Sequence, residues 1–138
     1  MERAESLTEF DKLAWLFKEV ERSLETQWDD ALWTAYALHP VHSAQRALSH
    51  GEHWLLLHPQ NTRLLYGLGE LCTRLKLWGK ARSYLEATRS IQPDRQTTLA
   101  LIRLYQAEGD FTAAENLMRE TIHNELSALQ SVVIDITG

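Results

Sequence analysis

The histidines are the side chains of this sequence with the clearest potential for metal or haem chemistry. The chain holds six of them, at positions 39, 42, 50, 53, 58 and 123. His50 and His53 are three residues apart and could share one helix face, where two imidazoles can ligate a metal or a haem iron. No companion carboxylate or cysteine completes a recognised set, and His50-Gly51-Glu52-His53 is not H-E-x-x-H. We therefore expect solvated or loop histidines, with tetrapyrrole binding at His50 and His53 as the alternative.

Residue patterns typical of an enzyme are absent from the sequence. There is no G-x-S-x-G, no P-loop and no Gly-rich dinucleotide turn, since Gly67-Leu68-Gly69 lacks the third glycine. Cys72, the only cysteine, falls on an apolar helix face, which favours a core position over a nucleophile. No nucleophile–base pair is supported by the spacing. We predict a non-catalytic protein that needs no cofactor.

Charge is distributed unevenly along the chain, whose net charge is −5. Residues 1–30 carry nine acids and four bases, residues 61–106 carry three acids and eight bases, and residues 107–138 carry six acids and one base. The basic middle could steer a partner, or its Lys and Arg side chains could simply solvate helix faces. Acids interrupt the basic residues and the overall balance is acidic, so we do not expect nucleic-acid binding.

Helical periodicity runs through nearly the whole sequence, which predicts an all-α fold. A helix over about 7–26 follows a possible capping box that begins at Ser6, and it carries an apolar stripe from Phe10 to Leu24. Trp15 and Leu16 widen this stripe, and we expect the helix to cover the neighbouring helix pair. Further helices are predicted at about 29–38, 43–58, 61–75, 78–91, 94–107 and 111–126.

A pattern of small and apolar residues occurs in the middle of the chain and again 33 residues later. The first copy runs from Leu65 through Gly69 and Ala81 to Pro93, and the second begins at Thr98. This spacing is that of a tetratricopeptide (TPR) repeat, in which two antiparallel helices form one unit. We expect Gly69 and Ala81 to face each other where the two helices cross.

The predicted fold is therefore a TPR-like α-α superhelix of about three helix pairs with one additional N-terminal helix. The pairs span about 29–59, 61–93 and 94–127, within a single domain of residues 1–128. Residues 129–138 are rich in β-branched side chains, and we expect an extended or disordered tail there.

In TPR arrays the first helix of each pair lines a concave surface, so residues one period apart should form columns. One such column consists of Trp33, Tyr66 and Leu99, and arginine side chains flank it. Tyrosine, tryptophan and arginine dominate binding hot spots, which favours a protein or peptide partner. The alternative is that Trp33 and Tyr66 pack between adjacent units. The complete set of predicted groove residues is Trp33, Arg63, Tyr66, Glu70, Arg74, Gln96, Leu99, Arg103 and Gln106.

Self-association is a further possibility. The apolar helix Phe10–Leu24 or the apolar segment Val132–Ile136 could form a homodimer contact.

The run from Leu77 to Ala87 resembles the HemY family of haem-biosynthesis-associated membrane proteins of proteobacteria. Similar stretches occur at Gln27–Asp29, Trp54–Pro59 and Leu65–Leu71, and together the resemblance covers about residues 27–122. It implies a C-terminal TPR domain that follows two transmembrane helices and takes part in a non-catalytic step of tetrapyrrole handling. It implies no catalytic residues.

No apolar run in the sequence approaches the roughly 18 residues that a membrane span requires. We therefore expect an excised domain or a soluble relative, without membrane contact of its own, although a full-length relative would be membrane-anchored. The expected location is the cytoplasm or the inner membrane surface of a bacterium.

Overall fold

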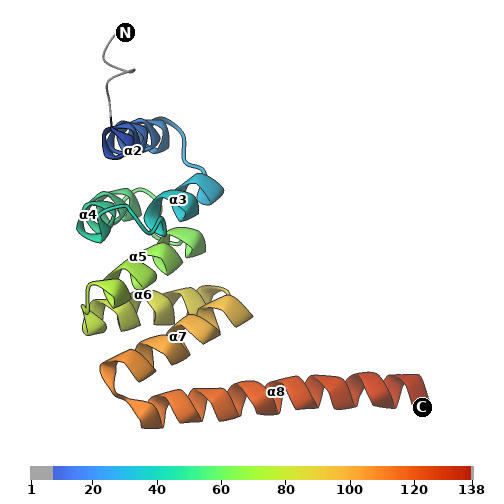
Figure 1. Cartoon of the computed structure of the whole chain (residues 1–138). Coiled ribbons are helices and arrows are strands. Elements are labelled where there is room, and N and C mark those ends of the chain that lie inside the picture. The colour runs from blue at the N-terminus through green and yellow to red at the C-terminus, as the bar shows by residue number, and fades with distance from the viewer. Residues whose placement is uncertain (1–7, 138) are drawn as a thin grey trace.

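The computed structural model describes residues 8–137, and within this range it contains seven helices and no strand (Figure 1). The all-α prediction is therefore confirmed. No helix in this part of the chain combines the length and apolarity that crossing a membrane requires. The helices are α2 (Glu9–Thr26), α3 (Asp30–Ala37), α4 (Ala44–Leu55), α5 (Thr62–Arg74), α6 (Trp78–Ile91), α7 (Arg95–Glu108) and α8 (Phe111–Thr137).

Most of the helices begin at a polar side chain that accepts a hydrogen bond from the backbone N–H three residues later. Such a bond satisfies one of the N–H groups that the first helical turn leaves without a partner. The capping box lies at Thr8 and Asp11, and the predicted box at Ser6 falls outside the described residues. The capping residues are Thr8, Asp29, Ser43, Asn61, Asp94 and Asp110.

The turns that follow α5 and α7 have the same geometry and lie 33 residues apart. Lys76, after α5, and Gly109, after α7, both adopt left-handed backbone conformations, with φ of 60° and 86°. The N–H of the next residue then donates back into the helix, over 2.8 Å from Leu77 to the carbonyl of Cys72 and over 2.8 Å from Asp110 to that of Tyr105. These equivalent turns show that α5–α6 and α7–α8 are built alike.

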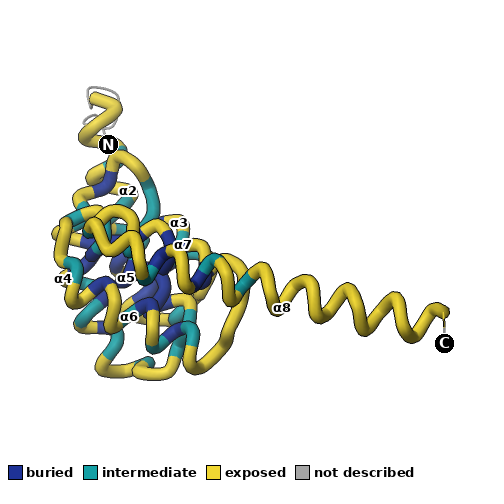
Figure 2. The backbone as a smooth tube through the Cα atoms, turned by 90° about the horizontal axis from the view of Figure 1, so that it is seen from below, coloured by how far each residue is buried: buried dark blue, intermediate teal, exposed yellow. Residues whose placement is uncertain are grey.

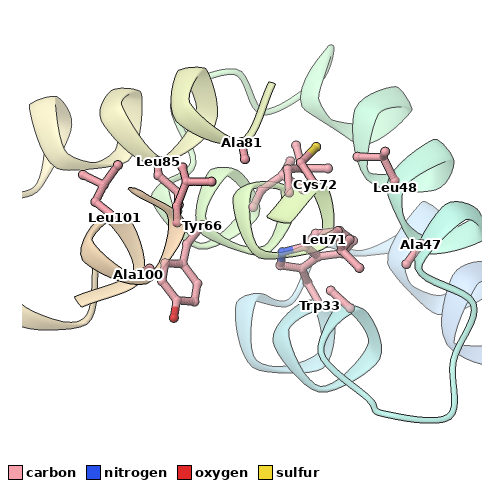
Figure 3. Close-up of a cluster of buried hydrophobic side chains, with 14 of the residues drawn as sticks. Trp33, Ala47, Leu48, Tyr66, Leu71, Cys72, Ala81, Leu85, Ala100 and Leu101 are labelled. Atoms are coloured by element: carbon pink, nitrogen blue, oxygen red, sulfur yellow. The ribbon is translucent and has the colours of Figure 1, made fainter. Parts of the chain in front are cut away.

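The helices stack in chain order, as Figure 1 shows. The most extensive contacts join α5 to α6, followed by α7 to α8 and α4 to α5, and α3 also packs on α5. One hydrophobic core runs through these helices from Leu24 to Leu117. Figure 3 shows part of this core, with Trp33 of α3 beside Leu71 of α5 and with Leu85 of α6 near Leu101 of α7.

Close packing inside the core depends on helical glycines. A Cβ atom at Gly69 would lie 2.5 Å from Cγ and Cδ2 of Leu85, so Leu85 packs directly against this glycine. Ala81 is also fully buried. The expectation of a close helix crossing holds.

Helix α2 covers the array only along its second half. Leu24 and Glu21 are buried, whereas Phe10, Trp15 and Leu16 are 75%, 60% and 48% exposed. The predicted apolar face is therefore only partly covered by the neighbouring helices. The reason is geometric, because α3 has eight residues and is too short to cover all 18 residues of α2.

The C-terminal segment differs from its prediction. Residues 129–137 are not extended, because they continue α8 as one helix of 27 residues. The β-branched side chains that favoured an extended tail cost a helix only about 0.5 kcal/mol each. A helix satisfies its backbone hydrogen bonds internally, whereas the described residues offer no strand with which an extended segment could pair. Figure 2 shows this part of α8 projecting from the body, exposed on all sides.

Candidate functional site

The predicted groove residues of α5 and α7 lie on matching faces of the two helices. Along each helix, successive members of this set are three or four residues apart, which keeps them on one side of the helix. We call this set the α5–α7 surface. Its members are Arg63, Tyr66, Glu70 and Arg74 on α5 and Gln96, Leu99, Arg103 and Gln106 on α7.

Two polar contacts join the two helices across this surface. The guanidinium of Arg63 donates to the side-chain oxygen of Gln96 over 3.3 Å, and Arg103 lies 3.5 Å from the carboxylate of Glu70. The partners in both pairs are 33 residues apart. The structure therefore brings these residues together at the spacing that the expected columns required.

Trp33 does not belong to an exposed surface. Its side chain is completely buried, and its indole N–H donates to the backbone carbonyl of Arg63 over 3.0 Å. Cβ atoms built on Gly51 and on Gly67 would both lie within 2.6 Å of the indole ring. The burial of Trp33 contradicts its predicted contact role, and the ring instead packs among α3, α4 and α5. The signal that could have revealed it is the pair of glycines inside helices, which often marks close packing.

Tyr66 is also mostly covered, with 6% of its surface exposed. Burial raises the pKa of its hydroxyl, and the nearby charge of Glu70 raises it further. Figure 3 shows Tyr66 of α5 close to Ala100 of α7. Tyr66 therefore packs between α5 and α7, while Leu99 remains 46% exposed beside it.

The two ends of α5 carry exposed cations. Arg63 lies in the first turn and Arg74 in the last, and both side chains face solvent. Neither forms an ion pair within the described residues. By contrast, the charge of Arg103 is partly balanced by Glu70. The α5–α7 surface thus offers two uncompensated positive charges, together with an exposed apolar side chain and two amides.

The histidines of α4 are directed toward carboxylates of α2. Nε2 of His50 lies 3.4 Å from Glu21, and Nε2 of His53 lies 3.8 Å from Glu25. The His50 ring also packs on Trp54, with 5.4 Å between ring centroids. A haem iron at these two histidines would have to displace both carboxylates. Within residues 8–137, no group of three or more His, Cys, Asp or Glu side chains is arranged to hold a metal ion.

The sequence did not reveal the buried polar cluster where α2 meets α3 and α4. Glu21 is only 5% exposed, and it accepts hydrogen bonds from the Tyr36 hydroxyl at 2.6 Å and from two nitrogens of Arg46 at 2.7 Å each. Burial acts to raise the pKa of Glu21, but the bonds from Arg46 and Tyr36 and the charge of His50 hold it below its usual range. These contacts join residues 15 to 29 positions apart, which no local pattern indicates. The cluster fixes α2 to the array.

Cys72 is buried in the core, as its apolar position predicts. Burial raises the pKa of its thiol to about 11, so the reactive thiolate is scarce at neutral pH.

An open cleft of about 600 Å³ lies on α6, α7 and α8, away from the predicted groove. Opposite charges bridge it, because Arg89 of α6 lies 3.2 Å from Glu120 of α8. The Tyr105 hydroxyl also donates to Glu86 over 3.1 Å. Since these charges are paired, the cleft presents less free charge than the α5–α7 surface. A small cavity of about 30 Å³ lies at that surface, beside Arg63, Tyr66 and Gln96.

Comparisons with known proteins add no identity to this geometry. No protein family matches the chain, and neither a curated protein nor a solved structure was found to match it.

Proposed function

We propose that this chain is a non-catalytic protein–protein interaction module of TPR type, in which α3 to α8 form three helix pairs of a TPR-like superhelix. Three features support this proposal: the 33-residue sequence pattern, the equivalent turns at Lys76 and Gly109, and the side-chain pairs 33 residues apart. Repeat arrays of this kind act by presenting a continuous surface that holds an extended ligand.

The observation that carries the proposal is the pair of uncompensated cations on α5. Arg63 and Arg74 are 11 residues apart, close to three full turns, so both point to one side of the helix at a separation of about 16 Å. An extended peptide advances about 3.3 Å per residue, and its successive side chains point to opposite faces. Acidic side chains four or six positions apart therefore share one face and span about 13 or 20 Å, on either side of this separation. We therefore propose an acidic, extended peptide segment as the ligand class.

Other residues of the surface supply weaker contacts. Leu99 offers an apolar contact between the two charges, and Gln96 and Gln106 offer amide groups to the backbone of the peptide. Arg103 becomes fully available only if a ligand carboxylate competes with Glu70. Tyr66 holds α5 and α7 at the distance that this arrangement requires.

The HemY resemblance suggests where such a partner would act. On that basis we propose a partner in haem biosynthesis, at the inner membrane surface of a bacterium. This part of the proposal depends on the residues from Leu77 to Ala87 and on the weaker similarities around them.

The test uses synthetic peptides that carry two glutamates separated by two to seven residues, with binding measured by fluorescence anisotropy. We expect the tightest binding for glutamates four or six positions apart, because these share one face of an extended peptide. Replacing both Arg63 and Arg74 by glutamine should weaken it roughly 3- to 10-fold, because an exposed ion pair contributes up to about 1 kcal/mol.

The matched control is Arg22→Gln, which removes an exposed arginine from α2 whose side chain is 74% exposed. Equal affinity for all spacings, or equal weakening by the control, would refute the proposed surface.

A further inference from the structure

Helix α8 extends well beyond the body of the molecule. Its last buried residue is Leu117, and every residue from Ile122 to Thr137 is exposed (Figure 2). This exposed part of 16 residues is about 24 Å long. A helix segment with apolar side chains and no neighbour is unusual, because its stability in water normally comes from packing of the apolar face.

The exposed part carries a regular apolar stripe, which we call the α8 stripe. Its residues are spaced four, three, four and three positions apart, which is the spacing of two helices that pack along a shared seam. All five side chains are between 56% and 77% exposed. The stripe consists of Ile122, Leu126, Leu129, Val133 and Ile136.

The α8 stripe lies on a different face of the helix from the residues that contact the body. Thr121, Asn124 and Ala128 lie on the other side of the helix, where they line a shallow cleft with the loop before α7. Glu125, next to the stripe, forms an ion pair of 3.0 Å with Arg95. These contacts with the body end at Ala128 and leave the stripe free, so the chain's own described residues do not cover it.

The charge pattern beside the stripe favours a second copy as its occupant. Charged residues flanking such a seam normally select a distinct partner and its orientation. Here no residue from Leu126 to Ile134 is charged, so a second copy meets no like charge along this stretch. The stripe is also nearly symmetric about Leu129, with Ile122 and Ile136 each seven residues away. An antiparallel copy therefore places Ile122 against Ile136 and Leu126 against Val133.

The size of the stripe sets the expected strength of the contact. A Leu, Ile or Val side chain contributes roughly 60 to 120 Å² of apolar surface, so the stripe and its flanks bury roughly 400 to 500 Å² per copy. The total of roughly 800 to 1,000 Å² falls in the class of weak, reversible interfaces. The dimer should therefore form at micromolar and higher concentrations.

We propose that the α8 stripe pairs with the same stripe of a second copy, antiparallel and centred on Leu129. This contact is separate from the α5–α7 surface, which lies on other helices. A dimer would present two such surfaces to one partner, which raises the apparent affinity for a ligand that carries two acidic segments.

Sedimentation equilibrium over a range of concentrations tests the contact. The native chain should show a monomer–dimer equilibrium, and Leu129→Glu should weaken it at least 10-fold because two glutamates then meet at the centre. Ser131→Glu adds the same charge on the far side of α8 and should leave the equilibrium unchanged. A strict monomer at millimolar concentration, or equal weakening by both variants, overturns the proposal and points to a different partner for the stripe.

Cysteine cross-linking tests the orientation. A mixture of Ile122→Cys and Ile136→Cys should form a disulfide-linked dimer, whereas Ile136→Cys alone should not. A dimer of Ile136→Cys alone, without one in the mixture of the two variants, overturns the antiparallel arrangement. The native Cys72 is buried and does not interfere. Because Leu129 lies outside the core, Leu129→Glu should keep the native unfolding transition and the native affinity for the acidic peptide. The dimer proposal and the α5–α7 surface can therefore fail independently of each other.

Discussion

At the scale of single residues, the most constrained chemistry lies where α2 meets the array. The His42 ring is 6% exposed and lies between Phe17 and Tyr36, at ring-centroid distances of 4.1 and 4.4 Å. Its Nε2 is buried and has no hydrogen-bond partner in the described part of the chain. Burial lowers the pKa of His42, and the charges of Arg46, His39 and His50 lower it further, while Glu21 acts in the opposite direction. The native state therefore holds a neutral imidazole.

This placement predicts a loss of stability in mild acid. A lowered pKa in the folded state means that His42 stabilises the fold above its ordinary pKa of 6.5 and that this contribution is lost as the pH falls below it. The lowered pKa of Glu21 acts in the same direction, but only as the pH falls below 4.5. In urea unfolding at pH 7 and pH 5, we expect the native chain to lose stability between the two values and His42→Phe to lose less.

The control for this prediction is His123→Phe, which replaces an exposed histidine of α8. It should follow the pH dependence of the native chain. If His42→Phe shows the same dependence as the native chain, the lowered pKa is not the cause.

At the scale of elements, the helices pack closely because glycine brings them together. Trp33 of α3 lies against Gly67 of α5, and a Cβ on Gly67 would be 2.5 Å from Nε1 of the indole and 2.8 Å from two of its carbons. The rigid ring is fixed by its bond to the carbonyl of Arg63, so it has little freedom to move. A Cβ atom built on Gly79, near the start of α6, would have no atom of another described element within 4 Å.

These two glycines predict opposite effects of the same substitution. Gly67→Ala should destabilise the fold by about 1 to 3 kcal/mol, the usual cost of forcing extra volume into a packed core. Gly79→Ala should be neutral or stabilising by up to about 1 kcal/mol, because alanine has the higher helix propensity. Chemical unfolding of both variants checks this prediction, and a stabilising Gly67→Ala would show that the indole ring can move aside.

At the scale of the whole molecule, stability is concentrated in the middle of the chain. The buried residues of the described range lie between Glu21 and Leu117. The first two turns of α2 and the last 16 residues of α8 contain none, and Figure 2 shows both segments as exposed. Segments with few buried contacts open locally at a lower free energy than the core.

Hydrogen exchange should therefore divide the molecule into three parts. Backbone amides of α5, α6 and α7, which carry the fully buried Leu68, Leu85 and Leu101, should exchange only on global unfolding. Amides of residues 9–16 and 122–137 should exchange much faster in dilute solution. Uniform slow exchange along α8 at low concentration would contradict this division, whereas protection that rises with concentration would support the pairing of α8 stripes.

The sequence by itself determined the features that depend on neighbouring residues. Helix positions, the capping residues Asp29, Ser43, Asn61 and Asp94, and the 33-residue period were all predictable, because periodicity and capping act within a few positions. The buried state of Cys72 followed from its place on an apolar face.

Only the tertiary structure decided where individual side chains go. Trp33 turned out to be buried because glycines on two other helices make room for its ring, and His50 and His53 face α2 because Glu21 and Glu25 lie there. The final turns of α8 are helical although their residues favour strands, since a helix satisfies its own backbone and no strand is near. These outcomes depend on contacts between segments far apart in the chain. Apart from the helical glycines that accompany the burial of Trp33, no local sequence pattern indicates them.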